Sequence, residues 1–149
     1  MKVYLATDHA AFELKEFVKQ QLQEGGYEVE DCGAFQFDPN DDYPDWIKIA
    51  AQKVAQNDGS FGVIFGKSGT GEAIVANKIK GVRAMIAFNE ESVRLSRQHN
   101  NANVISIGSE FANNEQAVMF IKLFINTPFS NEERHQRRIE KISQIENNE

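Results

Sequence analysis

The sequence contains a single cysteine, Cys32, among its 149 residues, so no disulfide can form within the chain. Such cysteine usage is typical of a reducing compartment, and we expect a cytoplasmic protein. Cys32 ends an expected strand with no histidine nearby in sequence, which favours a buried structural thiol over a catalytic one. The length suits one domain, residues 1–149, with a core large enough to fold without disulfides.

Long apolar runs and an excess of basic residues are also missing. No stretch approaches the roughly 18 apolar residues of a membrane span. Asp8 and His9 interrupt any apolar core of an N-terminal signal peptide. The formal net charge is −6 and the pI is near 5.1, which argues against nucleic acid as the main partner, because phosphate backbones attract basic surfaces. We therefore predict no membrane or nucleic-acid partner, and a small anionic ligand would need a local basic cluster.

Strand-like and helix-like segments alternate about five times along the chain. Apolar segments predict strands at 3–6, 27–32, 63–65, 82–87 and 104–107. Helices are predicted at 10–24, 73–78, 113–126 and 131–146, with a short one around residues 93–95. A further helix is predicted directly after a loop at 33–44, and residues 96–103 are predicted to be a polar connection. The alternation predicts an α/β fold, a three-layer α/β/α Rossmann-like domain with a five-stranded parallel sheet.

Helix-capping patterns mark the starts of several of these helices. Asn113 with Gln116, and Ser130 with Glu133, have the form of capping boxes, and Asn89 is a predicted N-cap. Ligands of parallel α/β folds bind beyond the carboxyl ends of the strands. We therefore expect Asp8, His9, the segment 66–72 and Gly108 to meet at one edge of the sheet.

A loop of small residues follows the third expected strand and carries the strongest functional signal. It comprises Gly66, Lys67, Ser68, Gly69, Thr70 and Gly71, and Glu72 then opens a helix that begins with Ala73 and runs to 78. Backbone N–H groups in such a turn converge and favour an anion. Glu72 is expected at the rim of this concave site, where its carboxylate could take a proton from a substrate.

Two nucleotide-binding patterns do not fit this loop. The P-loop requires four residues between its first glycine and Gly-Lys-Ser, whereas only three separate Gly62 from Gly66. The dinucleotide fingerprint would need a glycine where Ile74 stands. The remaining alternative is an ordinary tight turn that uses glycine for its positive φ.

Other polar residues each have a functional and a plain structural interpretation. Asp8 at a strand end could carry chemistry or only cap a helix, and His99 could transfer protons or be an exposed loop residue. Arg134 and Arg138, four residues apart on one helix face, could grip a phosphate or form a solvated charge stripe with Glu133 and Glu140. His135 is predicted on a helix surface. No Cys/His spacing suits zinc, so we predict no metal and no cofactor.

Taken together, these segments resemble the type B ribose-5-phosphate isomerases and their galactose-6-phosphate isomerase relatives. The matching segments are 7–10, 42–44, 66–72, 76–78, 81–84, 96–100 with Asn103, and 134–138. The resemblance implies an aldose–ketose isomerase that works without a metal through a cis-enediol(ate) and interconverts ribose 5-phosphate and ribulose 5-phosphate. It also implies a homodimer or a dimer of dimers, with the site between subunits and the last helix packed across the interface.

The resemblance also implies roles for individual residues. Glu72 would be the base, because this sequence has Gly66 where one branch of the family has a cysteine base, and Ser68 would bind the substrate. The N–H groups from Gly69 to Ala73 would stabilise the enediolate. Asp8 and His99 would assist ring opening. The phosphate would be bound by His9, Arg134 and Arg138, and the sugar would be lined by Tyr43 and Asn100.

Two positions depart from the resemblance, and the smaller departure is Ala11, where a glycine is usual. Glu110 stands where the family usually has an arginine that contributes to the phosphate site, so another sugar phosphate, such as a galactose-6-phosphate-like substrate, is an alternative. A catalytically silent sugar-phosphate-binding subunit is a second alternative. The presence of Glu72, Ser68, Asp8 and His99 favours the enzyme.

Overall fold

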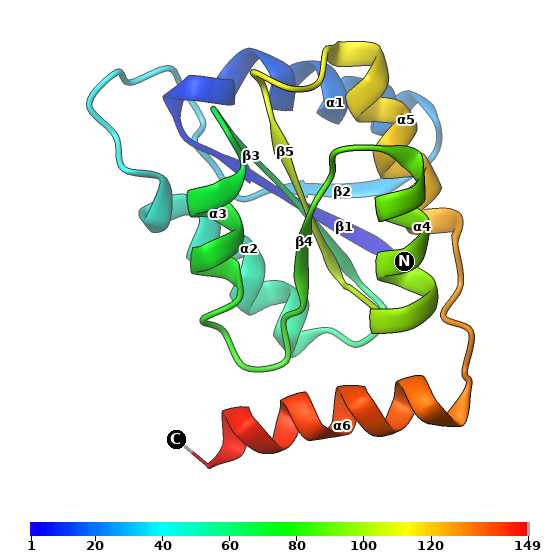
Figure 1. The fold of residues 1–149 in the computed structure, drawn as a ribbon. Helices are drawn as coiled ribbons and strands as arrows, with labels where there is room; N and C mark the ends of the chain where they lie inside the picture. Colours follow the sequence, from blue (N-terminus) through cyan, green and yellow to red (C-terminus); the bar gives the residue numbers. More distant parts are fainter. Residues whose placement is uncertain (149) are drawn as a thin grey trace.

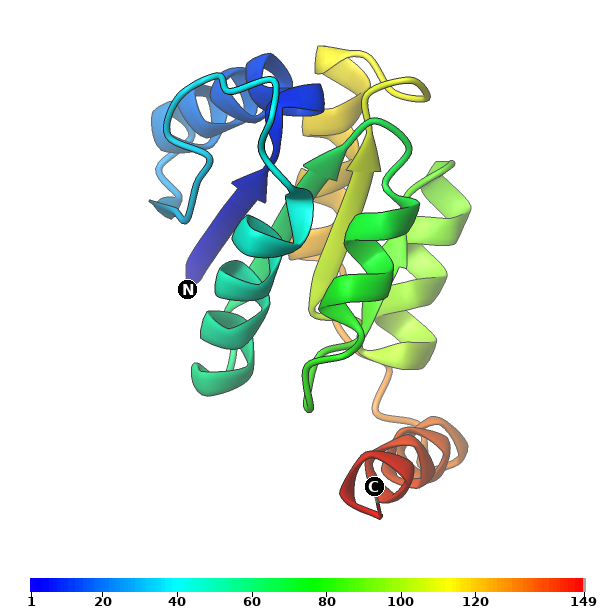
Figure 2. The same ribbon diagram turned by 90° about the vertical axis from the view of Figure 1, so that its left-hand side faces the viewer.

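The computed structural model describes residues 1–148 and contains one sheet of five strands. The strands are β1 (Lys2–Thr7), β2 (Glu28–Asp31), β3 (Phe61–Gly66), β4 (Ala84–Ile86) and β5 (Val104–Gly108). Neighbours pair in parallel in the order β2-β1-β3-β5-β4. Their carboxyl ends therefore lie at one edge of the sheet, as the arrowheads in Figure 2 show. The predicted five-stranded parallel sheet is confirmed.

Helices cover both faces of this sheet and give the predicted three layers (Figure 1). One face carries α1 (Phe12–Glu24), α4 (Glu90–Asn100) and α5 (Asn114–Asn126), and the other carries α2 (Tyr43–Gln56) and α3 (Thr70–Ala76). A 3₁₀ helix, η1 (His9–Ala11), leads into α1. Within residues 1–148, no helix combines the length and apolar character that crossing a membrane requires.

The alternation of side chains along the strands builds two cores. In β1, Val3 and Leu5 join the core under α1 and α5, whereas Tyr4 and Ala6 join the core under α2. This division follows from the strand geometry, since successive side chains point to opposite faces of a sheet. Both faces of β1, β3 and β5 are therefore apolar, which suits strands buried between two helix layers.

The helix α4 is longer than predicted. Residues 96–100 are helical, so the prediction of a polar connection there is wrong. Arg97, although charged, is buried, donates to the carbonyl oxygens of Thr127 and Ala102, and lies over the rings of Phe61 and Phe124. These contacts satisfy a polar side chain inside the protein, which hydrophobic periodicity alone does not reveal. Other boundaries differ by a few residues, the largest differences being that β4 spans only Ala84–Ile86 and that α3 spans Thr70–Ala76.

The last helix, α6 (Glu133–Asn147), lies beyond the amino ends of the strands (Figures 1 and 2), where Glu146 accepts from the Gly81 N–H at 3.1 Å. The predicted capping box at Ser130 is wrong, because the N-cap is Glu132 and makes no side-chain capping bond. The box of Asn113 with Gln116 is confirmed at the start of α5, and Asn89 caps α4 as predicted.

Candidate active site

The segment 66–72 joins β3 to α3 and is fixed against the end of β5. The Ser106 hydroxyl donates to the Gly69 carbonyl at 2.7 Å, and the Ser109 N–H donates to the Gly66 carbonyl at 2.9 Å. Gly69 has a φ of 83°, in the left-handed region that favours glycine. A Cβ on Gly108 would lie 2.4 Å from the Ser68 carbonyl oxygen, so β5 must end in glycine for the two segments to approach this closely.

The backbone N–H groups of this turn are only partly available to a ligand. The Ala73 N–H donates to the Gly69 carbonyl at 3.1 Å, and the Thr70 N–H donates to the Ser68 hydroxyl at 3.2 Å. The first turn of a helix leaves its leading N–H groups without helical acceptors. The N–H group of Gly71 is therefore better placed than that of Ala73 to meet a ligand oxygen, whereas the N–H of Glu72 acts on its own carboxylate.

Glu72 is buried, with 4% of its surface exposed, and does not lie at a rim as the sequence suggested. Its Oε1 atom has no hydrogen-bond partner among the described residues. Burial raises the pKa of Glu72, and the nearby charge of Asp8 raises it further, against the lowering effect of the backbone N–H groups of Glu72 and Gly69. A buried carboxylate with a free oxygen and a raised pKa is well suited to exchange a proton with a bound molecule.

Two close approaches shape the surroundings of the Glu72 carboxylate. A Cβ on Gly66 would lie 2.1 Å from this group, so Glu72 packs directly against the end of β3. A Cβ on Gly71 would lie 2.6 Å from the Tyr43 hydroxyl oxygen, so the first residue of α2 reaches the same turn. Both glycines therefore leave space for neighbouring side chains.

Asp8 lies at the carboxyl end of β1 and is also buried, with 7% exposed. Its Oδ1 atom accepts from the Ala10 N–H at 3.0 Å, so the capping interpretation of Asp8 is correct. Burial raises the pKa of Asp8, and the N–H of Ala10 opposes that effect. Since the charge of Asp8 also acts on Glu72, capping does not exclude a part in chemistry.

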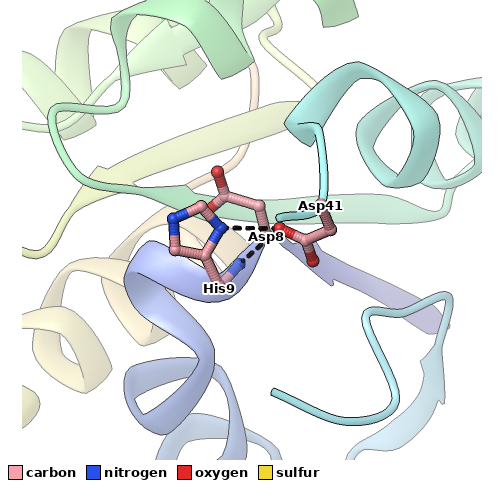
Figure 3. Close-up of side chains that lie close together, drawn as sticks. All are labelled: Asp8, His9 and Asp41. Carbon is pink, nitrogen blue, oxygen red and sulfur yellow. Dashed lines mark hydrogen bonds and ion pairs between the residues drawn. The ribbon is translucent and has the colours of Figure 1, made fainter. Parts of the chain in front are cut away.

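His9 is held by an acid that the sequence interpretation missed, Asp41, from the loop before α2 (Figure 3). The Asp41 Oδ1 atom lies 2.7 Å from His9 Nδ1 and accepts from the His9 backbone N–H at 3.0 Å. This hydrogen bond raises the pKa of His9. Asp41 sits in a run of turn-forming residues, 39–42, and nothing in that pattern distinguished it from an ordinary loop acid.

Asp8, His9 and Asp41 together offer ligand atoms within 4.8 Å of one another, the arrangement that a metal ion would need. The Nδ1 atom of His9 already meets the Asp41 carboxylate. The hydrogen bonds between His9 and Asp41 account for the closeness of these two residues without an ion.

We call Asp8, His9, Asp41, Ser68 and Glu72 the loop cluster. Four other predicted residues lie where the end of α4 meets the first half of α6, and we call them the helix cluster: His99, Asn100, Arg134 and Arg138. The His99 ring stacks on the ring of His135, with centroids 4.3 Å apart. His135 is 5% exposed, so its predicted surface position is wrong.

The loop cluster and the helix cluster lie at opposite ends of the sheet. The helix α4 runs back from the carboxyl end of β4 to the amino end of β5, and His99 is in its last turn. Figure 2 shows α6 below the amino ends of the strands, whereas the segment 66–72 follows the arrowhead of β3. A single chain therefore does not bring the predicted residues together.

The sequence matches the family model described as Ribose/Galactose Isomerase over residues 3–142. The chain belongs to this family. It is 42% identical over 146 residues to the ribose-5-phosphate isomerase B of Mycobacterium leprae (strain TN), covering 98% of this chain and 90% of that relative. The Escherichia coli (strain K12) ribose-5-phosphate isomerase B is 35% identical over 145 residues, covering 97% of this chain and 96% of the relative.

Solved structures of family members have the same fold as this chain. Ribose-5-phosphate isomerase B from Mycoplasma genitalium with bound ribulose 5-phosphate matches with a TM-score of 0.94 and 37% identity, covering 98% of this chain and 96% of that chain. The type B ribose 5-phosphate isomerase from Trypanosoma cruzi matches with a TM-score of 0.94 and 38% identity over all of both chains. The family resemblance predicted from the sequence motifs is confirmed.

Within this family fold, the outcome for the arginines is mixed. Arg134 and Arg138 are exposed on α6, and Arg134 lies 3.7 Å from Glu132. Glu133 pairs with Arg137, at 3.0 Å, and Glu133 and Glu140 are exposed as well, so a solvated charge stripe also fits this surface. The exposure of both arginines is compatible with either interpretation.

Proposed function

We propose that the protein is an aldose–ketose isomerase that interconverts ribose 5-phosphate and ribulose 5-phosphate. Family membership over nearly the whole chain supports this reaction class, as does the bound ribulose 5-phosphate of the Mycoplasma genitalium relative. The observation that carries the proposal is Glu72, a buried carboxylate with one oxygen free of hydrogen bonds at the ligand-binding edge of the sheet.

In this proposal Glu72 transfers the proton that moves along the sugar. Asp8 and His99 assist ring opening, which frees the C1 aldehyde. Glu72 then removes the proton from C2, the C–H electrons form the C1–C2 double bond, and O1 takes a proton to give a cis-enediol(ate). Return of the proton from Glu72 to C1, with loss of the O2 proton, leaves the C2 ketone. Atoms and charge balance without a metal or a cofactor.

The turn and its neighbours would hold the reacting part of the sugar. In this proposal the N–H groups of the turn, that of Gly71 foremost, stabilise the oxygen on which negative charge develops, and such preorganised donors lower the barrier. Ser68 and Tyr43 would bind hydroxyl groups, and His9 with Arg134 and Arg138 would bind the phosphate. Lys67 and Thr70, which are both exposed, would bind the substrate on the outer side of the turn.

The separation of the two clusters supports a homodimer with composite sites. A complete set of predicted residues requires the loop cluster of one copy and the helix cluster of another, because they lie at opposite ends of one chain. Exposed apolar residues offer a surface for such pairing: Ile74, Ile86 and Phe88 line a hollow beside α3 and the edge strand β4. In the dimer, α6 would pack across the interface.

A galactose-6-phosphate-like sugar is the second candidate substrate, and Glu110 favours it. Its backbone N–H donates to the Lys67 carbonyl at 3.0 Å, which fixes this exposed acid beside the active turn. A carboxylate there repels a phosphate that approaches from that side. We infer a cytoplasmic location from the single cysteine and the metabolic substrate class.

The test is turnover by the purified chain alone, with ribose 5-phosphate as substrate and ketose formation as readout. We expect turnover that persists in EDTA, and a loss of on the order of 10²–10⁴ in kcat for Glu72→Gln, with substrate binding nearly intact. More than about a tenth of wild-type kcat in that variant would exclude Glu72 as the base. Turnover of galactose 6-phosphate instead would favour the second candidate.

A further inference from the structure

We propose that Asp41 is a positioning residue that keeps His9 protonated and turns its free Nε2–H toward the phosphate of the substrate. The inference deepens the proposed function, because it rests on a phosphorylated sugar as ligand. It concerns a loop acid that does not itself touch the substrate.

The contacts of Asp41 account for a fixed orientation of His9. Its Oδ1 atom binds both the backbone N–H and the ring Nδ1 of His9, at 3.0 Å and 2.7 Å, so backbone and side chain are held together. Its Oδ2 atom accepts from the indole N–H of Trp46 at 3.2 Å. The carboxylate is therefore anchored from α2 as well, and 7% of the Asp41 side chain is exposed.

The part of the His9 ring that does not meet Asp41 contacts Phe37 and lies beside a hollow. The ring meets Phe37 edge to face, with centroids 6.2 Å apart. Because Nδ1 is turned to Asp41, Nε2 is the nitrogen left for a ligand, and it points away from Asp41 in Figure 3. His9 also lines a hollow of about 820 Å³ together with Phe37 and Ser109.

The charge of Asp41 explains how this acid would help His9 to bind the phosphate. The hydrogen bond from Asp41 raises the pKa of His9, and the charges of Asp8 and Asp38 act in the same direction. Glu13 and Glu115, which line the same hollow, are further acids on that side. A protonated imidazole whose other N–H is tied to a carboxylate donates through Nε2 a charge-assisted hydrogen bond, which is roughly twice as strong as a neutral one.

The experiment compares Asp41→Asn with Asp38→Asn. Both changes remove one negative charge from the same loop and keep a side-chain oxygen, but Asp38 bonds to the Asn40 N–H and reaches His9 only through its charge. The protonation of His9 is followed by NMR of its ring nitrogens. Affinity for ribose 5-phosphate is measured by calorimetry at pH 5.5 and pH 8.

We expect Asp41→Asn to lower the pKa of His9 and to weaken binding of ribose 5-phosphate at pH 8. At a pH above the His9 pKa values of both proteins, a fall of one pKa unit lowers the protonated fraction of His9 about tenfold. The affinity for ribose 5-phosphate at pH 8 should fall by up to the same factor. At pH 5.5 both proteins carry a protonated His9, so the ratio of their affinities should approach one. Comparing ratios at each pH cancels the titration of the phosphate itself. Asp38→Asn should change affinity less than threefold.

An equal loss of affinity at both pH values would mean that Asp41 only shapes the loop, and the inference would be wrong. Unchanged binding in Asp41→Asn would also overturn it. If that variant does not fold, the wild-type titration still decides, since a His9 pKa at or below about 6.5 contradicts the role. Absence of turnover by the wild-type protein would count against the proposed function, whereas the His9 titration would still test Asp41.

Discussion

The carboxylate of Glu72 occupies the space into which a side chain at Gly66 would project. A Cβ built on Gly66 lies 2.1 Å from the Glu72 carboxylate, closer than atoms can approach without movement. Gly66 is also the position at which one branch of the resembling isomerases has a cysteine base. The two possible bases would therefore act from the same place in the site, although they belong to different residues of the chain.

We predict from this contact that Gly66→Ala displaces the Glu72 carboxylate. Turnover should fall at least about tenfold, because small displacements of catalytic groups are costly. The free energy of unfolding should fall as well, by on the order of 1–3 kcal/mol for overpacking. The control is the same change in a Glu72→Ala background, where the space is empty and the loss of stability should largely disappear. Equal losses in both backgrounds would contradict the contact.

The separation of the loop cluster from the helix cluster predicts complementation between inactive variants. Glu72→Gln and His99→Ala should each have low activity alone. Mixed dimers, formed by unfolding and refolding the two together, would contain one site with both wild-type residues. About a quarter of wild-type activity should return if half of the dimers are mixed and each has one intact site of two. No recovery, with mixed dimers demonstrated by mass spectrometry, would place the site within one chain.

The buried position of Glu72 predicts that its ionised carboxylate destabilises the protein at neutral pH. Its pKa is raised in the folded protein, so the folded state binds the proton more tightly than the unfolded state. Stability contributed by the protonated form is therefore lost as the pH rises through that raised value. We expect Glu72→Gln to melt at a higher temperature than the wild type at pH 8, with a smaller difference near pH 4. A lower melting temperature at pH 8 would contradict this account.

Glu110 provides a test of the phosphate site. Replacing it with arginine removes a repulsive charge and adds a possible charge-assisted contact, which contributes roughly 1.5–3 kcal/mol. We expect Glu110→Arg to lower KM for ribose 5-phosphate by about tenfold or more, with a smaller change in kcat, because the phosphate is remote from the proton transfer. The effect should shrink as salt rises.

Glu110→Gln is the matched control for that variant, since it removes the charge without adding one. It should give an intermediate KM. An unchanged or higher KM in Glu110→Arg would mean that Glu110 points away from the phosphate, or that the native substrate uses it to accept a hydroxyl hydrogen bond. A panel of pentose and hexose phosphates, with their unphosphorylated parents, separates these two outcomes.

Local sequence patterns were sufficient for the sheet, for most helices and for the loop that carries Glu72, because short apolar strands and glycine-rich turns are determined by neighbouring residues. They failed where contacts distant in sequence decide the structure. Arg97 is buried through bonds to Thr127 and Ala102, and His135 through its stack on His99. Asp41 was missed for the same reason, since only the folded chain brings it to His9.

The place of α6 in the fold also affects how the activity would depend on the amount of protein. If each site needs the helix cluster of a second copy, dissociated chains have a base but lack the arginines that hold the phosphate. Specific activity would then fall on dilution below the dimer dissociation constant, and substrate, by bridging two copies, would oppose that dissociation through mass action. A substitution at Phe88, which lines a hollow next to Thr70 and Ala73, would then weaken catalysis on dilution because it lowers the concentration of complete sites.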